Sequence, residues 1–250
     1  MSRFIVITSG KGGVGKTTTA VNLATAMNSL DEDVTLVDVN LTTPNVGLHL
    51  GAPVVPVTFN HVLSGKADLV DSIYEHESGT KIIPASLSIK ELKQLNNRDL
   101  ITVARDLKQV SDTVILDCAA GLGGEAITAL QIADEVIIVT NPEMPAVTDA
   151  LKTAKLAEEM KKKVLGVIVT KVEGRKSEMS LESIEEMLEL PILGIVPRDD
   201  KVQEALSMRN AVFLTHPNSK VARSYIEIAS KLLGKEVPKK KGFFKRLFGV

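Results

Sequence analysis

Near its N-terminus the chain reads Gly10-Lys11-Gly12-Gly13-Val14-Gly15-Lys16-Thr17, which fits the phosphate-loop pattern G-x-x-x-x-G-K-[ST] at every position. An apolar run at 4–7 precedes this stretch, and residues with helical spacing follow it at 20–27. Glycines let the backbone curl around a phosphate, so that successive N–H groups and the start of the next helix face the anion. We expect Lys16 to reach the β- and γ-phosphates and Thr17 to bind Mg²⁺. The predicted phosphate-loop contacts are Gly10, Gly12, Gly13, Val14, Gly15, Lys16, Thr17 and Thr18.

Short aliphatic runs recur along the chain and alternate with segments of helical spacing. The runs are continuous rather than alternating, which is typical of strands buried on both faces of a parallel sheet. The sequence therefore predicts an α/β fold: a doubly wound, mostly parallel sheet with helices on both faces and ligands at the carboxyl ends of the strands. The expected strands are 4–7, 34–37, 82–83, 114–116, 136–139, 164–169 and 192–196. The expected later helices are 88–96, 98–110, 124–132, 145–161, 180–189 and 219–233.

Composition excludes several classes of protein. With 44% hydrophobic residues, the 250-residue chain can bury a full core. Its net charge of −1 argues against a globally basic nucleic-acid binder. The single cysteine, Cys118, excludes a disulfide framework and any multi-cysteine metal or iron–sulfur site within one subunit. No apolar stretch fits a signal peptide or a membrane span, so we expect a cytoplasmic protein.

Lys11 is a cation that the minimal phosphate-loop pattern does not require; on the residues alone it fits a solvated lysine on a flexible loop. The wider stretch, K-G-G-x-G-K-T, resembles the deviant Walker A ATPases of the MinD/ParA family, a branch of the P-loop NTPases. In that family the first lysine crosses a dimer interface and contacts phosphate bound by the other subunit. A cation there stabilises developing charge as an arginine finger does. The resemblance implies ATP and Mg²⁺ as ligands, a homodimer, and catalytic roles for Lys11 and Lys16, with Lys11 also contacting nucleotide.

The second expected strand ends near Asp38, which matches the first position of the family's first switch, D-x-D, and is expected to bind the metal. Asn45 matches a polar position of the same switch and is expected at the nucleotide. The aspartate that orients or activates the attacking water in the family is replaced here by Asn40. A carboxamide cannot accept the water's proton, and a lost general base costs about 10²–10⁴-fold in rate. An amide can still orient water, so we expect slow ATP hydrolysis with Asn40 in the catalytic group.

The run at 114–116 leads into Asp117. An aspartate at the end of an apolar strand is often a simple strand-end cap, but beside a phosphate loop it is the expected Walker B carboxylate, which holds the Mg²⁺ shell. The resemblance further implies that the backbone of Gly121 senses the γ-phosphate. We expect Cys118 to be inert core.

The base site follows from the resemblance alone. The family binds adenine between the loop after strand 164–169 and a loop near 197. Both segments depart from the family pattern, which often has asparagine near 170 and P-E-D near 197, so ATP is favoured on family grounds only. The residues expected to hold the base are Thr170, Lys171, Pro197, Arg198 and Asp199.

The last twelve residues, 239–250, carry five cations and no acid. On a helix their apolar residues fall at i, i+1, i+4 and i+5, opposite the cations, which is the pattern of an interfacial membrane anchor. A disordered basic tail and a docking helix for a protein groove are the alternatives. The resemblance favours the anchor, because MinD-like chains end in a nearly identical segment, and it implies anionic lipid as a partner. The expected membrane residues are Lys241, Phe243, Phe244, Lys245, Arg246, Leu247 and Phe248.

Together these features predict a P-loop ATPase domain at 1–234, a basic linker at 235–241 and an amphipathic tail at 242–250. The expected function is an ATP-dependent, dimerising ATPase switch, peripheral on the inner face of the cell membrane, that organises a division site or another polar structure with a regulatory or cargo protein. One alternative is a nucleotide-binding membrane scaffold with little hydrolysis. A ParA-like DNA partitioner and an iron–sulfur carrier are less well supported, because the globule is acidic and cysteines are lacking. Nucleic acid is not an expected partner.

Overall fold

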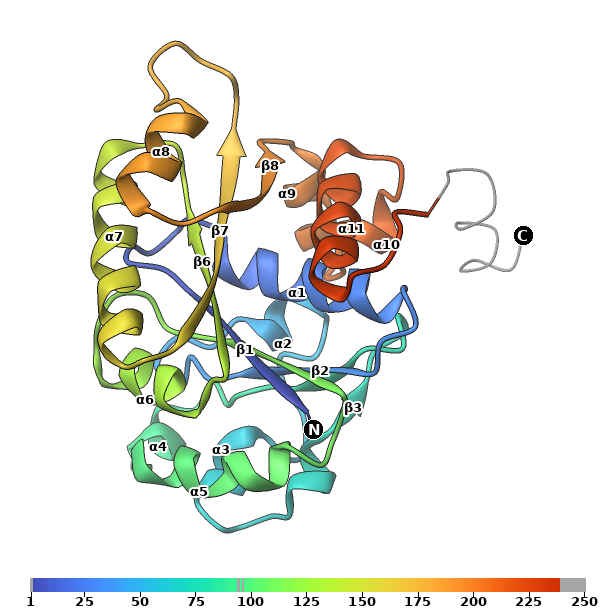
Figure 1. Ribbon diagram of the computed structural model, residues 1–250. Helices are drawn as coiled ribbons and strands as arrows, with labels where there is room; N and C mark the ends of the chain where they lie inside the picture. The colour runs from blue at the N-terminus through green and yellow to red at the C-terminus, as the bar shows by residue number, and fades with distance from the viewer. Residues whose placement is uncertain (1, 94, 96, 239–250) are drawn as a thin grey trace.

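The computed structural model of the protein describes residues 2–93, 95 and 97–238. Within them, an eight-stranded sheet carries helices on both faces (Figure 1). The strand order is β3-β4-β2-β5-β1-β6-β7-β8, and every neighbouring pair is parallel except β3 with β4. The strands are β1 (Arg3–Thr8), β2 (Val34–Asp38), β3 (Tyr74–Glu75), β4 (Lys81–Ile83), β5 (Thr113–Asp117), β6 (Glu135–Thr140), β7 (Lys163–Val172) and β8 (Ile192–Pro197).

The central strands are continuous apolar runs because both of their faces are covered. Every residue of β2, β5 and β6 is buried. Each of the seven expected runs lies inside a strand, and the prediction of a doubly wound, mostly parallel sheet is confirmed. The sequence did not predict β3, a two-residue antiparallel strand at the edge of the sheet.

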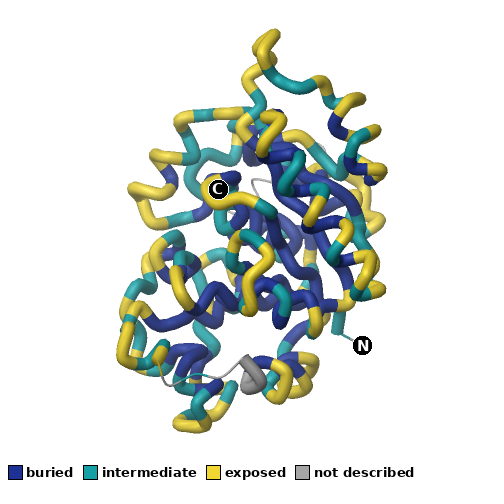
Figure 2. Tube along the Cα trace, turned by 90° about the vertical axis from the view of Figure 1, so that its left-hand side faces the viewer, coloured by how far each residue is buried: buried dark blue, intermediate teal, exposed yellow. Residues whose placement is uncertain are grey.

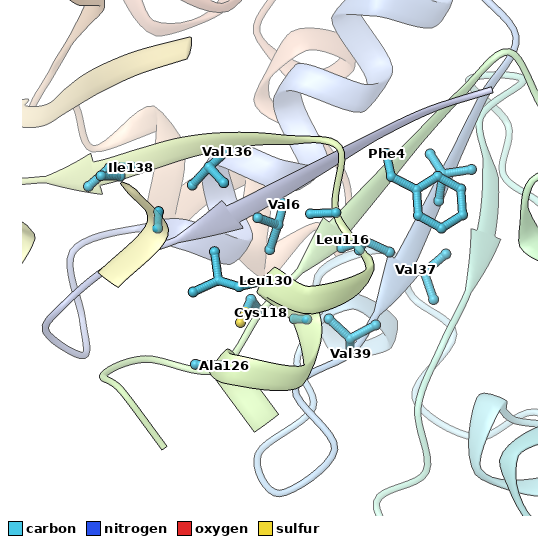
Figure 3. Packing of buried hydrophobic residues seen from close by; sticks show 14 of the residues in the cluster. Phe4, Val6, Val37, Val39, Leu116, Cys118, Ala126, Leu130, Val136 and Ile138 are labelled. Atoms are coloured by element: carbon cyan, nitrogen blue, oxygen red, sulfur yellow. The ribbon is translucent and has the colours of Figure 1, made fainter. Parts of the chain in front are cut away.

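Alternate residues of β1 supply two separate cores, one on each face of the sheet. Phe4 and Val6 pack on one face with α3 (Phe59–Leu63), α5 (Asn97–Leu107), α6 (Gly124–Ile132), α7 (Met144–Glu159) and α8 (Leu181–Leu188). Figure 3 shows this core around Leu130 of α6. Ile5 and Ile7 pack on the other face with α1 (Lys16–Asn28), α2 (Val46–His49), α9 (Lys201–Ser207), α10 (Val212–Thr215) and α11 (Lys220–Leu233). Figure 2 shows the buried backbone running through the centre, with exposed segments around it.

The helices are α1 (Lys16–Asn28), α2 (Val46–His49), α3 (Phe59–Leu63), α4 (Ile89–Leu92), α5 (Asn97–Leu107), α6 (Gly124–Ile132), α7 (Met144–Glu159), α8 (Leu181–Leu188), α9 (Lys201–Ser207), α10 (Val212–Thr215), α11 (Lys220–Leu233) and the 3₁₀ helix η1 (Leu69–Ser72). The predicted helix at 88–96 is wrong in length: α4 ends at Leu92, where the Leu95 N–H turns back to the Leu92 carbonyl, and residues 94 and 96 lie outside the described residues. The helix predicted at 98–110 ends at Leu107, because residues 107–110 form tight turns. The remaining predicted helices match within two residues.

The phosphate loop lies at the middle of the carboxyl edge of the sheet. It follows β1, whose two neighbours are β5 and β6. From β1 the chain winds first toward β2 and later back toward β6, so the order of strands reverses at this point. Such a reversal is where open α/β sheets bind ligands. The loops after β2, β5, β6, β7 and β8 open at the same edge.

Candidate nucleotide-binding site

The phosphate loop leaves an unblocked helix start at the carboxyl edge of the sheet. Gly15 precedes α1 with a φ of 97°, a left-handed conformation that disfavours side chains, and no side chain caps the helix. Gly10 passes so close to α7 that an added Cβ would lie 2.1 Å from the carbonyl oxygen of Asp149. The first N–H groups of α1 are thus available to an anion, as the sequence predicts.

Lys16, Thr17 and Asp117 come together beneath this loop. Lys16 is only 8% exposed; burial lowers its pKa, while the Asp117 charge acts in the opposite direction. The Thr17 hydroxyl donates to Asp117 Oδ2 over 2.6 Å. Burial raises the pKa of Asp117 to about 6, although the Thr17 hydrogen bond and the Lys16 charge oppose this. The predicted metal-binding pair, Thr17 and Asp117, is therefore in direct contact.

Asp38 lies opposite Asp117 in the register of β2 and β5, and it is completely buried. Its carboxylate accepts hydrogen bonds from the N–H groups of Asn40, Asn45 and Val46 at 2.9–3.1 Å. Burial and the Asp117 charge nevertheless raise the pKa of Asp38 well above its ordinary value. If both buried carboxylates are ionised side by side, they hold more negative charge than the nearby Lys16 balances.

This unbalanced charge fits a magnesium ion. Asp117 Oδ1 is buried and has no hydrogen-bond partner, so a ligand position is open on a carboxylate that prefers a cation. Among the described residues, no three His, Cys, Asp or Glu side chains gather into a cation cage. Mg²⁺ is commonly held by one or two protein oxygens together with waters and substrate phosphates. Thr17 and Asp117, with Asp38 beside them, would hold it, and the ion would supply charge to the phosphates.

The loop after β2 closes on itself around Asn40. The Asn40 amide nitrogen donates to the Thr43 carbonyl over 2.7 Å, and its Oδ1 accepts from the Thr43 hydroxyl over 3.0 Å. Asn45 also donates from its side chain to the Thr43 carbonyl, over 2.8 Å. Both amides are thus engaged within the loop, and the water-orienting role of Asn40 and the nucleotide contact of Asn45 stay predictions.

The loop after β5 is tied directly to the phosphate loop. The Gly121 N–H, expected to sense the γ-phosphate, donates to the Ser9 carbonyl over 2.9 Å. The Ser9 hydroxyl in turn donates to the Lys11 carbonyl over 2.8 Å. Because of these two hydrogen bonds, a displacement of either loop would shift the other.

Cys118 is fully buried behind Asp117. Burial, followed by the Asp117 charge, raises the pKa of its thiol to about 12.

Lys11 differs from Lys16 in its surroundings. Its side chain is 47% exposed, and its Nζ lies 3.8 Å from a carboxylate oxygen of Glu143, which is itself 59% exposed. Glu143 immediately precedes α7. Two lysines of one short loop thus have separate environments, one beneath the loop and one on its outer surface.

A pocket of about 320 Å³ adjoins the phosphate loop and is lined by all five residues expected to hold the base. Lys171 donates to the Gly13 carbonyl over 2.6 Å, and the Thr170 hydroxyl lies 2.5 Å from the Val14 carbonyl oxygen. Arg198 is paired with Glu173 over 3.0 Å. The structure therefore brings the predicted base residues together with Gly15 and Thr18 of the phosphate loop.

Sequence reasoning missed other residues of this pocket and a contact of the loop after β2. Asn141 Oδ1 lies 2.9 Å from the Thr170 hydroxyl, Asp200 is the residue just before α9, and Gln203 lies in α9. Glu125, in the first turn of α6, accepts hydrogen bonds from Thr42. A polar residue just after β6 was a usable signal for Asn141, whereas α9 and the Glu125 contact depend on tertiary packing.

A larger cavity, about 520 Å³, lies at the far end of α1, away from every motif residue. Its walls include Leu30, Lys235 and Pro238, so the segment after α11 borders it. Gly234 ends α11 with a φ of 63°, which matches the predicted end of this helix at 233. The predicted membrane residues in 241–248 lie outside the described residues. None of the described helices has the length and apolar character that a membrane span needs.

A parallel sheet that reverses its winding at a phosphate loop, with buried carboxylates and a base-sized pocket beside that loop, defines a P-loop nucleotide-binding protein. Residues 5–212 match the family profile of the CobQ/CobB/MinD/ParA nucleotide binding domain. The chain belongs to this family of ATPases and is a MinD-like member of it.

Three relatives support this placement. An uncharacterized ATP-binding protein of Methanocaldococcus jannaschii is 36% identical, over 100% of this chain and 98% of that protein. The septum site-determining protein MinD of Escherichia coli is 33% identical, over 100% of both chains. The structure of Pyrococcus horikoshii MinD in complex with Mg-ADP is 32% identical and superposes with a TM-score of 0.89, over 93% of this chain and 96% of that one.

Proposed function

We propose that the protein is an ATP-driven membrane switch. It binds Mg·ATP, dimerises in that form, attaches to the inner face of the cell membrane through residues 242–250, and is released by slow hydrolysis. In this role it positions a regulatory or cargo protein at a division site or another polar structure. The proposal extends what Mg-ADP binding in a MinD relative and the family's ATPase activity support.

The observation that carries the dimer proposal is the contrast between Lys16 and Lys11. Lys16 is 8% exposed beneath the loop, where it can neutralise phosphate bound by its own subunit. Lys11 is half exposed, and Glu143 is an equally accessible partner. An ion pair between exposed side chains contributes little, so Lys11 can exchange Glu143 for the phosphate of a second subunit. A cation delivered in this way stabilises the charge that develops in phosphoryl transfer.

The energetics of the tail support control by dimerisation. Burying four apolar side chains contributes about 6–12 kcal/mol at most, and five cations near anionic lipid add about 1 kcal/mol each. Ordering roughly eight residues costs about 8–16 kcal/mol. The balance for one tail is therefore close to zero. Two tails on one dimer gain avidity of about 10²–10⁴, so ATP-dependent dimerisation would control attachment.

Liposome co-sedimentation tests the proposal. The full chain should sediment with anionic vesicles under Mg·ATP, remain in the supernatant under Mg·ADP, and bind neutral vesicles only weakly. The variant Phe244→Glu with Leu247→Glu should lose sedimentation and keep its ATP affinity. A matched control is Val54→Glu with Val70→Glu, the same change at side chains that are 88% and 70% exposed in the described domain. Sedimentation of the tail variant under ATP would refute the anchor.

A second candidate is a nucleotide-dependent membrane scaffold that barely hydrolyses ATP. Asn40 favours it, because a carboxamide cannot act as a general base and both polar atoms of this amide are engaged by Thr43. A steady-state turnover assay with vesicles separates the two. Release of phosphate at the rate of membrane release supports the switch, and membrane binding without phosphate release supports the scaffold.

A further inference from the structure

Glu125 holds the tip of the loop that follows β2. It lies in the first turn of α6 and is half buried. The Thr42 hydroxyl donates to Glu125 Oε1, and the Thr42 N–H donates to Oε2 over 3.4 Å. Both oxygens of one carboxylate are therefore engaged by one residue of the loop. Hydrogen bonds to an ionised carboxylate are stronger than neutral ones, so this contact can fix the position of the tip.

The root of the same loop is fixed independently. The buried Asp38 carboxylate accepts from the N–H groups of Asn40 and Asn45 over 3.1 and 2.9 Å. Asn40 thus lies between two anchors, Asp38 at the root and Glu125 at the tip. Asn40 is 7% exposed, and its carboxamide is hydrogen-bonded to Thr43, the neighbour of Thr42. The amide cannot turn toward a water molecule unless Thr43 moves, and Thr43 cannot move far while Thr42 is held.

We propose that Glu125 is a positioning residue that restrains hydrolysis: through Thr42 it keeps Asn40 bonded to Thr43 and away from the attacking water. This inference rests on the proposed function, because the restrained step is the hydrolysis of ATP. The contact joins the loop after β2 to the helix that follows the Asp117 strand. A shift of α6 relative to this loop would release Asn40, so the restraint links the loop after β2 to the segment that follows β5.

A simpler explanation of Glu125 must be tested against this one. Acidic side chains in the first turn of a helix are stabilised by the helix dipole whether or not they touch a loop. Glu182 occupies the equivalent place in α8 and is exposed. Replacing it with alanine removes the same charge from the same kind of position. Glu182→Ala is therefore the matched control for Glu125→Ala.

The test uses the full chain with two measurements, hydrogen exchange of the amides at 41–46 and turnover of Mg·ATP. Glu125→Ala and Thr42→Val should each speed exchange at 41–46 and raise kcat about threefold to tenfold, as for one lost charge-assisted hydrogen bond in a partly exposed site. KM should change less than about twofold. The double variant should match Glu125→Ala, because that change already removes both hydrogen bonds from Thr42, whereas Thr42→Val removes only the one from the hydroxyl. Glu125→Gln keeps one acceptor oxygen, so its kcat and its exchange rate should fall between those of the parent chain and those of Glu125→Ala.

Several outcomes would overturn the restraint: unchanged exchange at 41–46 in Glu125→Ala, a lower or unchanged kcat despite faster exchange, or additive effects of Glu125→Ala and Thr42→Val. An equal effect of Glu182→Ala would assign the result to the helix dipole. If no variant and no parent chain hydrolyses ATP while exchange rises as expected, the contact at Thr42 stands and the proposed ATPase switch fails. The two failures are thus distinguishable.

Discussion

Replacing Asp117 with asparagine should stabilise the protein in the absence of nucleotide and Mg²⁺. Burial raises the pKa of Asp117 from an ordinary value of 3.8 to about 6. Each pH unit corresponds to about 1.4 kcal/mol, so ionised Asp117 costs the folded chain about 3 kcal/mol at pH 7. Asparagine keeps an acceptor for Thr17 but leaves amide hydrogens without a partner, at a cost of about 1 kcal/mol. Removing the Asp117 charge also relieves Asp38, and the lost attraction to Lys16 is already included in the pKa of Asp117.

The expected net gain is therefore about 2 kcal/mol, or roughly 4–8 °C in Tm for a chain of this size. Its pH dependence has a definite sign. Because the folded pKa of Asp117 is raised, the folded protein binds more protons than the unfolded chain between pH 3.8 and about 6. The stability of the parent chain should fall as pH rises through this window and level off above it. The advantage of Asp117→Asn should be full at pH 7 and absent near pH 4.

Thermal and urea unfolding at pH 4, 5.5 and 7, with and without Mg·ATP, measure these effects. The parent chain should gain Tm on adding Mg·ATP. Asp117→Asn should gain little, because the carboxylate oxygen open to the metal becomes an amide NH₂, which does not bind a cation. Glu135→Gln is the opposing control. Burial raises the pKa of Glu135, but bonds from Lys163 and Arg3 outweigh it and lower that pKa, so this variant should be destabilised at pH 7. An Asp117→Asn chain less stable than its parent at pH 7 would refute the reasoning.

Three further predictions concern the phosphate loop and its neighbours. Lys16→Ala should abolish Mg·ATP binding by calorimetry, because it removes the buried cation beneath the loop; unchanged affinity would contradict the site. Lys11→Ala should bind ATP with near-parent affinity yet hydrolyse none, and light scattering with a non-hydrolysable analogue should show a dimer for the parent chain; a parent that stays monomeric would contradict the role across the interface. Asn40→Asp should raise turnover at least about tenfold, and an equal rate would mean that no general base is missing.

The fold could be predicted because its central strands are continuous apolar runs buried on both faces, a signal that local sequence carries. The elements that were missed are short. They are β3, α2, α3, η1, α9 and α10, which have two to seven residues, so a period of two or 3.6 hardly shows. These elements depend on packing against the sheet for their existence. The error at 88–96 has the same cause, since helical spacing continued past the residues at which α4 ends.

The candidate site likewise contains residues that local sequence reveals and contacts that it does not. The phosphate loop is contiguous, so eight consecutive residues reveal it. Asp38 and Asp117 were also recognisable, because each ends an apolar strand and parallel strands end at one edge. The contacts of Lys11 with Glu143 and of Thr42 with Glu125 join residues 132 and 83 positions apart. No local pattern specifies such pairs, and the folded structure alone brings them together.

Cys118 makes the protein a convenient object for thiol chemistry. A thiol reacts as the thiolate, and here both access and ionisation are suppressed, because the residue is fully buried and its pKa is about 12. Alkylation of the native chain therefore requires the end of β5 to open, and its rate measures that opening. Since the chain has one cysteine, a cysteine introduced at an exposed position such as Val54 would be labelled first. Because Cys118 does not react in the folded chain, a spectroscopic probe can be attached at the introduced cysteine alone.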